Sequence, residues 1–485
     1  MTTLVPREPY SEEELGKLYP KGLQLQLVQI LLRHGERTPV APRFQNAGLP
    51  AYWPYCKASS RFTSTVLATT DPASSSWDNL QWQRHLERFS DSDDAPTLAT
   101  SPTGDPNSMC QPGELTDLGR QTTLALGQRL RNLYIQQLSF LPSDLTPTVL
   151  DSLYLRATPI PRALESLQQA FIGLYPPRTR PSTLPPPAII LRSPGDETLF
   201  PNEVVCRRLN ALARAFGQRT ADRHNTSPAL QHATKLIGKY VEGDVRVDGK
   251  PRLSGILDTV NATLAHGPLT RLPSEFYDPQ LRDTLERVNV EEWYSGYQEN
   301  REYRMLGIGS LAADIVGRMV QRAEGKGVVR FSMSGCHDTT LAGLLSSLGA
   351  FKGTKWPPFT SHVAIELFRK DMDGLAAKKS GGGWFHWVNP MADKSEIGRK
   401  PMDELNSVQR ERLDGYYVRL RYNDAVVTVP GCKAAGKHLE GDESFCTLEA
   451  FKAIVDKYTP RDWKQQCKEN MGKTAFPEKP EPSGY

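Results

Sequence analysis

Residues 33–39 read Arg-His-Gly-Glu-Arg-Thr-Pro, and they follow an apolar run at residues 25–32 that predicts a buried β-strand. A histidine flanked by two arginines at the end of such a strand is difficult to explain as packing. A strand end holds its side chains at a fixed point of the sheet edge, so Arg33, His34 and Arg37 should meet there. Two guanidiniums form a bidentate cage for phosphate, and an imidazole aimed at phosphorus is a nucleophile. The motif therefore predicts phosphoryl transfer through a phosphohistidine.

Polar residues also follow two other predicted strands. Arg156 ends the stretch 153–155, and the pair His337-Asp338 comes after the stretch 328–334. Ligands of open α/β sheets bind outside the carboxyl ends of the strands, where such residues converge. Asp338 would protonate the leaving alkoxide and then activate water. The predicted site therefore consists of His34 as nucleophile, Asp338 as acid and base, and Arg33, Arg37, Arg156 and His337 as ligands of the phosphate oxygens.

The predicted cage supplies positive charge by itself. Its arginines disfavour the protonated imidazole, so the pKa of His34 should lie below its ordinary value, and the nucleophile should remain available in mildly acidic solution. The sequence has no carboxylate cluster with magnesium spacing and no glycine-rich phosphate loop. We therefore expect an activity that needs neither metal nor other cofactor.

Composition and charge exclude several classes of protein. The chain has 485 residues with 59 basic and 55 acidic side chains, a near balance that argues against a nucleic-acid partner. It has no apolar run of the roughly 20 residues that span a bilayer, and residues 1–20 lack the hydrophobic region of a signal peptide. Seven scattered cysteines without zinc spacing suggest mostly reduced thiols in a cytoplasmic enzyme, although Cys432 and Cys446 could pair in an oxidising compartment.

The order of strand-like and helix-like stretches predicts an α/β fold with a helical insertion. Strands are expected at residues 25–32, 153–155, 188–191, 328–334, 362–368 and 416–423, the last two as antiparallel neighbours. The expected division is an N-terminal arm (1–22), a core (23–200 and 326–467) with long excursions at 41–111 and 370–413, a helical cap (201–325) and a flexible tail (468–485).

The motifs resemble those of a known family. Residues 33–39 and the pair 337–338 match the two signatures of the histidine acid phosphatases, branch 2 of the histidine phosphatase superfamily. The stretch 113–119 and the block of Arg156 with Arg162 and Ser166 resemble further family segments, except that Ala157 replaces the usual serine. Within the family, the stretch 355–359 (Lys-Trp-Pro-Pro-Phe) is most similar to the lysophosphatidic acid phosphatase type.

The resemblance implies a phosphoglycerate-mutase-like three-layer α/β core, with a mainly parallel central sheet and an inserted α-helical cap. It implies the same six site residues and a small phosphomonoester as substrate, with a lysophospholipid as one candidate. It also opens a mitochondrial alternative to the cytoplasm. A phosphomutase, a phytase-like inositol phosphate phosphatase and a non-catalytic phosphate- or phospholipid-binding protein remain alternatives. The oligomeric state is not predicted.

Overall fold

The structure, a computed structural model, describes residues 2–485 except 71–75, 91, 352, 354 and 372–395. Its centre is an eight-stranded sheet with the strand order β11-β12-β9-β8-β1-β7-β6, and β10 pairs with β9. Pairing is parallel between β1, β7 and β6 and antiparallel elsewhere. The strands are β1 (Leu23–Arg33), β6 (Leu153–Ala157), β7 (Phe331–Cys336), β8 (His362–Lys370), β9 (Tyr416–Tyr422), β10 (Ala425–Val427), β11 (His438–Leu439) and β12 (Asp442–Thr447).

The central strand β1 is buried on both faces, and alternate side chains enter different cores. Leu27 and Leu31 belong to the core on one side of the sheet, whereas Val28, Ile30 and Leu32 belong to the core on the other. This follows from the two-residue period of a strand. Because helices cover both faces, apolar residues dominate the buried part of the strand from Leu27 to Leu32, where the buried Gln29 is the polar exception.

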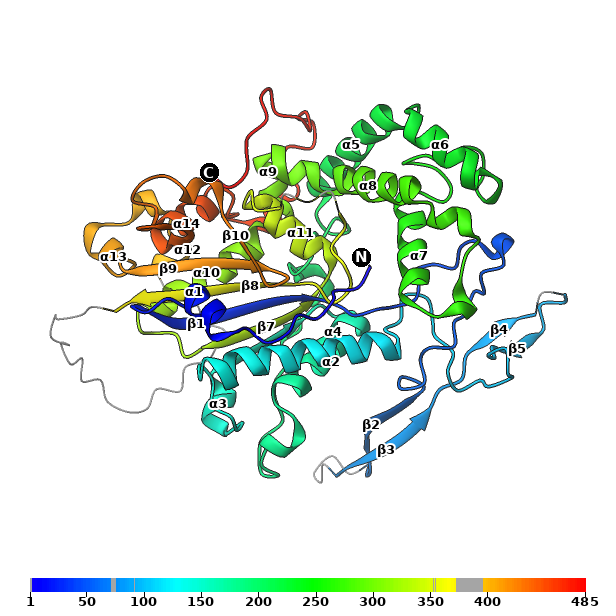
Figure 1. Ribbon diagram of the computed structural model, residues 1–485, viewed down its shortest axis with the longest axis horizontal. Helices are drawn as coiled ribbons and strands as arrows, with labels where there is room; N and C mark the ends of the chain where they lie inside the picture. Colours follow the sequence, from blue (N-terminus) through cyan, green and yellow to red (C-terminus); the bar gives the residue numbers. More distant parts are fainter. Residues whose placement is uncertain (1, 71–75, 91, 352, 354, 372–395) are drawn as a thin grey trace.

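Helices form the outer two layers (Figure 1). The short α3 (Pro147–Asp151) and the long pair α2 (Asp117–Arg131) and α4 (Pro161–Leu174) cover one face, while α10 (Ser310–Ala323), α11 (Asp338–Ser347) and α14 (Leu448–Asp456) cover the other. Thr116 caps α2 by accepting a hydrogen bond from the backbone of Gly119, and proline is the first residue of α4. The predicted three-layer α/β core is confirmed.

A separate helical group forms the cap beside the sheet (Figure 1). Its own apolar core includes Phe44, Leu49 and Trp53 from the excursion that follows β1. The cap and the excursion are therefore packed together rather than independent. The cap helices are α5 (Arg207–His224), α6 (Pro228–Ile237), α7 (Leu253–Ala265) and α8 (Pro279–Glu299). The apolar side of α5 and the C-terminal half of α8 also pack into the core between the sheet and α10. The remaining short helices are α1 (Glu12–Leu18), α9 (Arg301–Arg304), α12 (Glu396–Arg399), α13 (Ser407–Glu411) and α15 (Trp463–Gln466).

The excursion at 41–111 contains two hairpins that project from the body (Figure 1). One pairs β2 (Arg61–Leu67) with β3 (Trp77–Gln83), and the other pairs β4 (Glu87–Phe89) with β5 (Pro96–Leu98). The described residues of the other excursion, 370–413, include α12 and α13, and its middle part lies outside the described residues.

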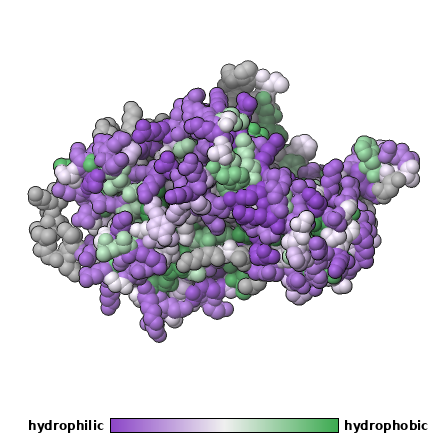
Figure 2. Space-filling view, turned by 90° about the horizontal axis from the view of Figure 1, so that it is seen from above, coloured by the Kyte–Doolittle hydropathy of each residue, from purple (hydrophilic) through white to green (hydrophobic). Residues whose placement is uncertain are grey.

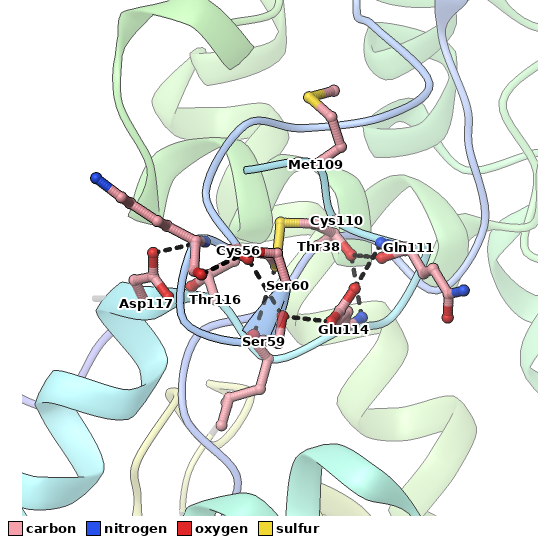
Figure 3. The surroundings of a disulfide bond; sticks show 12 residues. Thr38, Cys56, Ser59, Ser60, Met109, Cys110, Gln111, Glu114, Thr116 and Asp117 are labelled. Atoms are coloured by element: carbon pink, nitrogen blue, oxygen red, sulfur yellow. Dashed lines mark hydrogen bonds between the residues drawn. A yellow bond between two sulfur atoms is a disulfide. The ribbon is translucent and has the colours of Figure 1, made fainter. Parts of the chain in front are cut away.

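A disulfide between Cys56 and Cys110 closes the first excursion at its base (Figure 3). Next to it, the Thr38 hydroxyl donates to the carbonyl of Gln111 at 2.7 Å and accepts from the backbone N–H of Glu114 at 3.2 Å. The C-terminal end of the excursion is thereby attached to the loop that carries the first motif.

Several boundaries differ from the expectation. The stretch 188–191 forms no strand and contributes a single bridge, from Ile190 to Arg156. Residues that we expect in the cap form α10, which packs on the sheet, so the cap ends before that helix. Element type was predictable there, but the surface that the helix covers was not.

The C-terminal segment 468–485 also differs from the expected flexible tail, because it lies against the body. The Arg208 side chain donates to the carbonyl of Lys473 at 2.9 Å, and that of Asn300 donates to the carbonyl of Ala475 at 2.8 Å. Its proline content had suggested disorder, but buried side chains from the cap bind its backbone.

Six of the seven cysteines are paired, which corrects the expectation of mostly reduced thiols. The bonds join Cys56 to Cys110, Cys206 to Cys467 and Cys432 to Cys446, and Cys336 is free and buried. Disulfides persist in oxidising compartments and are rare in the cytosol. The cytoplasmic location therefore stays a prediction, and these three bonds count against it.

The surface seen from above is mostly hydrophilic, with hydrophobic residues in scattered patches (Figure 2). Within the described part of the chain, no helix combines the length and the apolar character needed to cross a bilayer.

Candidate active site

A cavity of about 330 Å³ lies where β1 and β7 end, between the sheet and the cap. It contains five of the six residues predicted from the sequence. Its other walls come from α4, α7, α8 and the loop before β8. The lining residues are Arg33, His34, Arg37, Val40, Arg43, Ile160, Arg162, Phe200, Ser254, Gly255, Leu257, Asp258, Asn261, Trp293, His337, Asp338, Thr339, Trp356 and Phe359.

His34 follows the last residue of β1, and its backbone N–H donates to the carbonyl of Cys336 at the end of β7. Its Nδ1 lies 2.9 Å from the carbonyl oxygen of Gly35. A carbonyl only accepts, so Nδ1 carries the proton and Nε2 keeps the free lone pair. The ring is buried and lines the cavity. The backbone therefore selects the tautomer that a nucleophilic Nε2 requires.

Gly35 allows the backbone of the first motif to pack against the start of α2. A Cβ at Gly35 would lie 2.2 Å from the carbonyl oxygen of Gly119, and a Cβ at Gly119 would lie 2.2 Å from the carbonyl oxygen of Glu36. The backbone at the start of α2 therefore packs directly on the first motif. This contact gives a physical reason for the glycines in both sequence segments.

Burial and three guanidiniums keep the His34 imidazole neutral. Desolvation lowers its pKa well below the ordinary value, and Arg162, Arg33 and Arg37 lower it further. Burial and Arg162 also lower the pKa of His337, whose Nε2 lies 3.0 Å from the Thr158 hydroxyl. This environment agrees with the predicted lowering of the His34 pKa.

Asp338 is the first residue of α11 and lies against the cage. Its Oδ2 accepts from Arg33 Nη2 at 2.7 Å and from the indole N–H of Trp356 at 2.9 Å, and its Oδ1 accepts from the backbone N–H of Thr339 at 2.8 Å. Burial alone would raise the pKa of this carboxyl, but Arg33, the Trp356 hydrogen bond and Arg37 outweigh burial and lower it. The free site therefore holds an Asp338 carboxylate.

The loop before β8 supports Arg33 from the other side. Arg33 Nη1 donates to the carbonyl of Pro357, and its guanidinium lies 4.3 Å from the ring centroid of Phe359. The ring of Phe359 also lies 6.0 Å from that of His34. The loop therefore fixes both a phosphate ligand and, through Trp356, the carboxylate.

Arg37 is held by the cap. Its Nη1 lies 2.7 Å from Oδ1 of Asp258 on α7, whose Oδ2 accepts from the backbone N–H of Val40 at 3.0 Å and lies 3.4 Å from Arg43 Nη1. The cap thus contributes a carboxylate directly to the cage.

The structure places Arg156 outside the cavity, which corrects its expected role as a phosphate ligand. Its Nη2 lies 2.6 Å from Oε1 of the buried Glu197, and Nη1 lies 3.7 Å from Asp314 on α10. The end of strand β6 points this side chain between the sheet and α10. Arg162, the second residue of α4, lines the cavity instead.

The cavity carries an excess of positive charge. Four guanidiniums and two carboxylates line it, which leaves a net charge of plus two when both histidines are neutral. Burial and the neighbouring Arg37 lower the pKa of Arg162 to about 10, so it still remains cationic near neutral pH. A phosphate dianion would neutralise the cavity. Among the described residues, no group of three or more His, Cys, Asp or Glu side chains could hold a metal ion.

Sequence reasoning missed Arg162, Asp258 and Trp356 as members of the site. Arg162 had a usable signal, because it follows a proline that begins a helix after β6, and helix starts of this kind face the sheet edge. Trp356 was noticed only as part of a distinctive stretch. Asp258 had no local signal, because the packing of α7 alone brings it to Arg37.

Comparison with known proteins agrees with this geometry. The chain is 37% identical over 467 residues to a probable acid phosphatase of Schizosaccharomyces pombe, covering 93% of this chain and 96% of the relative. It is 27% identical over 361 residues to the human lysophosphatidic acid phosphatase type 6, covering 72% of this chain and 74% of the relative.

Solved structures show the same fold. The Hafnia alvei phytase in its apo form covers 92% of this chain and 99% of its own, with a TM-score of 0.55 at 13% identity. The Bifidobacterium longum multiple inositol polyphosphate phosphatase, in complex with inositol hexasulfate, covers 95% and 98%, with a TM-score of 0.54 at 10% identity. The family model of the histidine phosphatase superfamily, branch 2, matches residues 24–423, and the chain belongs to this family.

Proposed function

We propose that this phosphatase hydrolyses phosphomonoesters through a phosphohistidine at His34, without a metal ion. The net charge of plus two in the cavity, with Nε2 of a neutral imidazole in its wall, is the observation that carries the proposal. It matches the charge of a phosphomonoester dianion, and the guanidiniums supply hydrogen bonds to the equatorial oxygens.

The proposed reaction has two steps. Nε2 of His34 attacks phosphorus, the ester P–O bond breaks, and the Asp338 carboxyl gives its proton to the leaving alkoxide. Water then attacks the phosphohistidine and passes a proton to the Asp338 carboxylate, the P–Nε2 bond breaks, and inorganic phosphate leaves. A bound phosphate dianion weakens the positive field at Asp338, which favours its protonated form for the first step.

The cavity walls favour a lipid-like monoester over an inositol polyphosphate. Phe200, Trp293 and Trp356 give the cavity an aromatic side, and no lysine from the described part of the chain lines it. Arg43 also lines the cavity outside the predicted cage, but its guanidinium is already paired with Asp258. A lysophospholipid, the substrate class in the name of the human relative, is therefore our leading candidate substrate.

Phosphate release from lysophosphatidic acid, para-nitrophenyl phosphate and inositol hexakisphosphate, each with chelator present, tests the proposal. His34→Ala should abolish release, and Asp338→Ala should impair the lipid more than the nitrophenyl ester, whose leaving group needs little protonation. The exposed His85→Ala is the matched control and should retain wild-type activity.

Other results would favour the alternatives. Phosphomonoester binding without release would indicate a non-catalytic binding protein, and transfer of phosphate between two phosphoglycerates would indicate a phosphomutase. A preference for inositol hexakisphosphate would contradict the inference that the cavity walls favour a lipid-like monoester.

A further inference from the structure

One face of α7 supplies polar side chains to the cavity. Ser254, Asp258 and Asn261 are spaced four and three residues apart, which places them on one side of the helix. All three are only partly buried and all three line the cavity, whereas most of the helix is buried in the cap. We call these three residues the α7 polar face.

The members of this face differ in their partners. Asp258 is fully engaged by Arg37, Arg43 and the backbone of Val40. Within the described part of the chain, the Ser254 hydroxyl and the Asn261 amide have no hydrogen-bond partner. The face therefore offers one neutral hydroxyl and one neutral amide beside the phosphate cage.

Charge limits what such a face can bind. A single phosphate dianion already neutralises the net charge of plus two in the cavity. A second anionic group near the α7 polar face would lie beside the Asp258 carboxylate, and the two guanidiniums next to it, those of Arg37 and Arg43, are already bonded to that carboxylate. A neutral hydroxyl can instead donate to or accept from both free side chains.

We propose that the α7 polar face binds a hydroxyl group of the leaving alcohol, so that the site selects monophosphates of neutral polyols. Ser254 and Asn261 supply the hydrogen bonds, and Asp258 disfavours substrates with a second phosphate. This inference rests on the phosphatase activity proposed above and assigns the residues that recognise the alcohol part.

A pair of substrates that differ only in hydroxyl groups tests the hydrogen-bonding residues. We would measure kcat/KM for glycerol 3-phosphate and for n-propyl phosphate in the wild type, Asn261→Ala and Ser254→Ala. Each variant should lower the ratio of the two values by about two- to tenfold, the effect of one lost hydrogen bond. Activity on propyl phosphate should stay within about twofold, since that substrate makes no such bond.

The controls separate this inference from the proposed function. Gln218→Ala, at an exposed position of cap helix α5, should leave the ratio unchanged, and Asn261→Gln should recover part of it. Loss of activity on both substrates in His34→Ala supports the phosphatase reaction independently of the ratio. An unchanged ratio in both alanine variants, with activity retained, would overturn the role of the α7 polar face.

The proposed role of Asp258 is tested with a different pair of substrates. Asp258→Asn should raise kcat/KM for propane-1,3-diol bisphosphate relative to propyl phosphate, and salt should narrow the wild-type difference because it screens the repulsion. Comparing the ratio cancels the effect of the substitution on the phosphate that both substrates share, and the salt dependence is measured in the wild type, where Arg37 and Arg43 keep their partner. A ratio that neither Asp258→Asn nor salt changes would contradict the charge argument.

Discussion

The most specific consequence of the structure is that Arg162, and not Arg156, should bind the phosphate. Arg162 lines the cavity without an acidic partner within the described part of the chain, so Arg162→Ala removes a ligand of the phosphate and little else. A charge-assisted hydrogen bond contributes about 1.5–3 kcal/mol, which corresponds to a loss of roughly 10- to 150-fold in kcat/KM. The melting temperature should change little, because the substitution also relieves repulsion from Arg37.

Arg156→Ala should behave in the opposite way. It leaves the fully buried Glu197 without its partner at 2.6 Å, and breaking a buried ion pair costs about 3–5 kcal/mol of stability. We therefore expect a markedly lower melting temperature, with near-normal activity in the fraction that remains folded. Thermal unfolding and phosphate release on the same preparations separate the two effects.

The pH dependence of kcat/KM distinguishes a catalytic role of Arg162 from a structural one. Arg162 is the largest electrostatic cause of the lowered pKa of His34, after burial. Arg162→Ala should therefore raise that pKa and move the acid limb of the kcat/KM profile to higher pH, whereas Arg162→Lys should largely preserve the limb. Full activity in Arg162→Ala, or a purely catalytic defect in Arg156→Ala with normal stability, would refute the reassignment.

Three further results are expected. Burial would raise the Asp338 pKa, but Arg33 outweighs burial and lowers it, so above pH ~6 neither the free Asp338 carboxylate nor the free phosphate dianion carries the proton that the first step needs; kcat/KM for an alkyl phosphate should therefore fall about tenfold per pH unit, and a rise between pH 6 and 8 would contradict this. Trp356→Phe removes a hydrogen bond that positions Asp338, so kcat for an alkyl ester should drop about tenfold and that for para-nitrophenyl phosphate less; equal losses would argue against positioning. Replacing Cys56 and Cys110 together by serine opens a loop with a sequence separation of 54 and should cost up to ~4 kcal/mol in denaturant unfolding, with an unchanged midpoint as the contrary outcome.

The sequence predicted correctly those site residues that lie at the ends of adjacent parallel strands. Arg33 and His34 stand at the end of β1, and His337-Asp338 stand at the end of β7, its parallel neighbour. The apolar run predicted the strand, and the convergence of strand ends predicted the meeting of the residues. No long-range information was needed for this step.

The same rule failed for Arg156 because it locates the backbone and not the side chain. Alternate residues of a strand point to opposite faces, and Arg156 points toward α10. Asp258 on α7 lies beyond any local rule, since its position depends on how the cap packs. The pairing of Cys206 with Cys467, across a sequence separation of 261, likewise requires the complete fold.

Trapping the covalent intermediate tests the central claim most directly. The enzyme would be mixed with ³²P-labelled para-nitrophenyl phosphate, quenched within milliseconds in alkaline denaturant and digested, and the labelled peptide sequenced. We predict an acid-labile, base-stable phosphoryl group on His34, absent from His34→Ala and accumulating in Asp338→Ala on this substrate. Turnover by His34→Ala at the wild-type rate, or a label on another residue, would contradict the account.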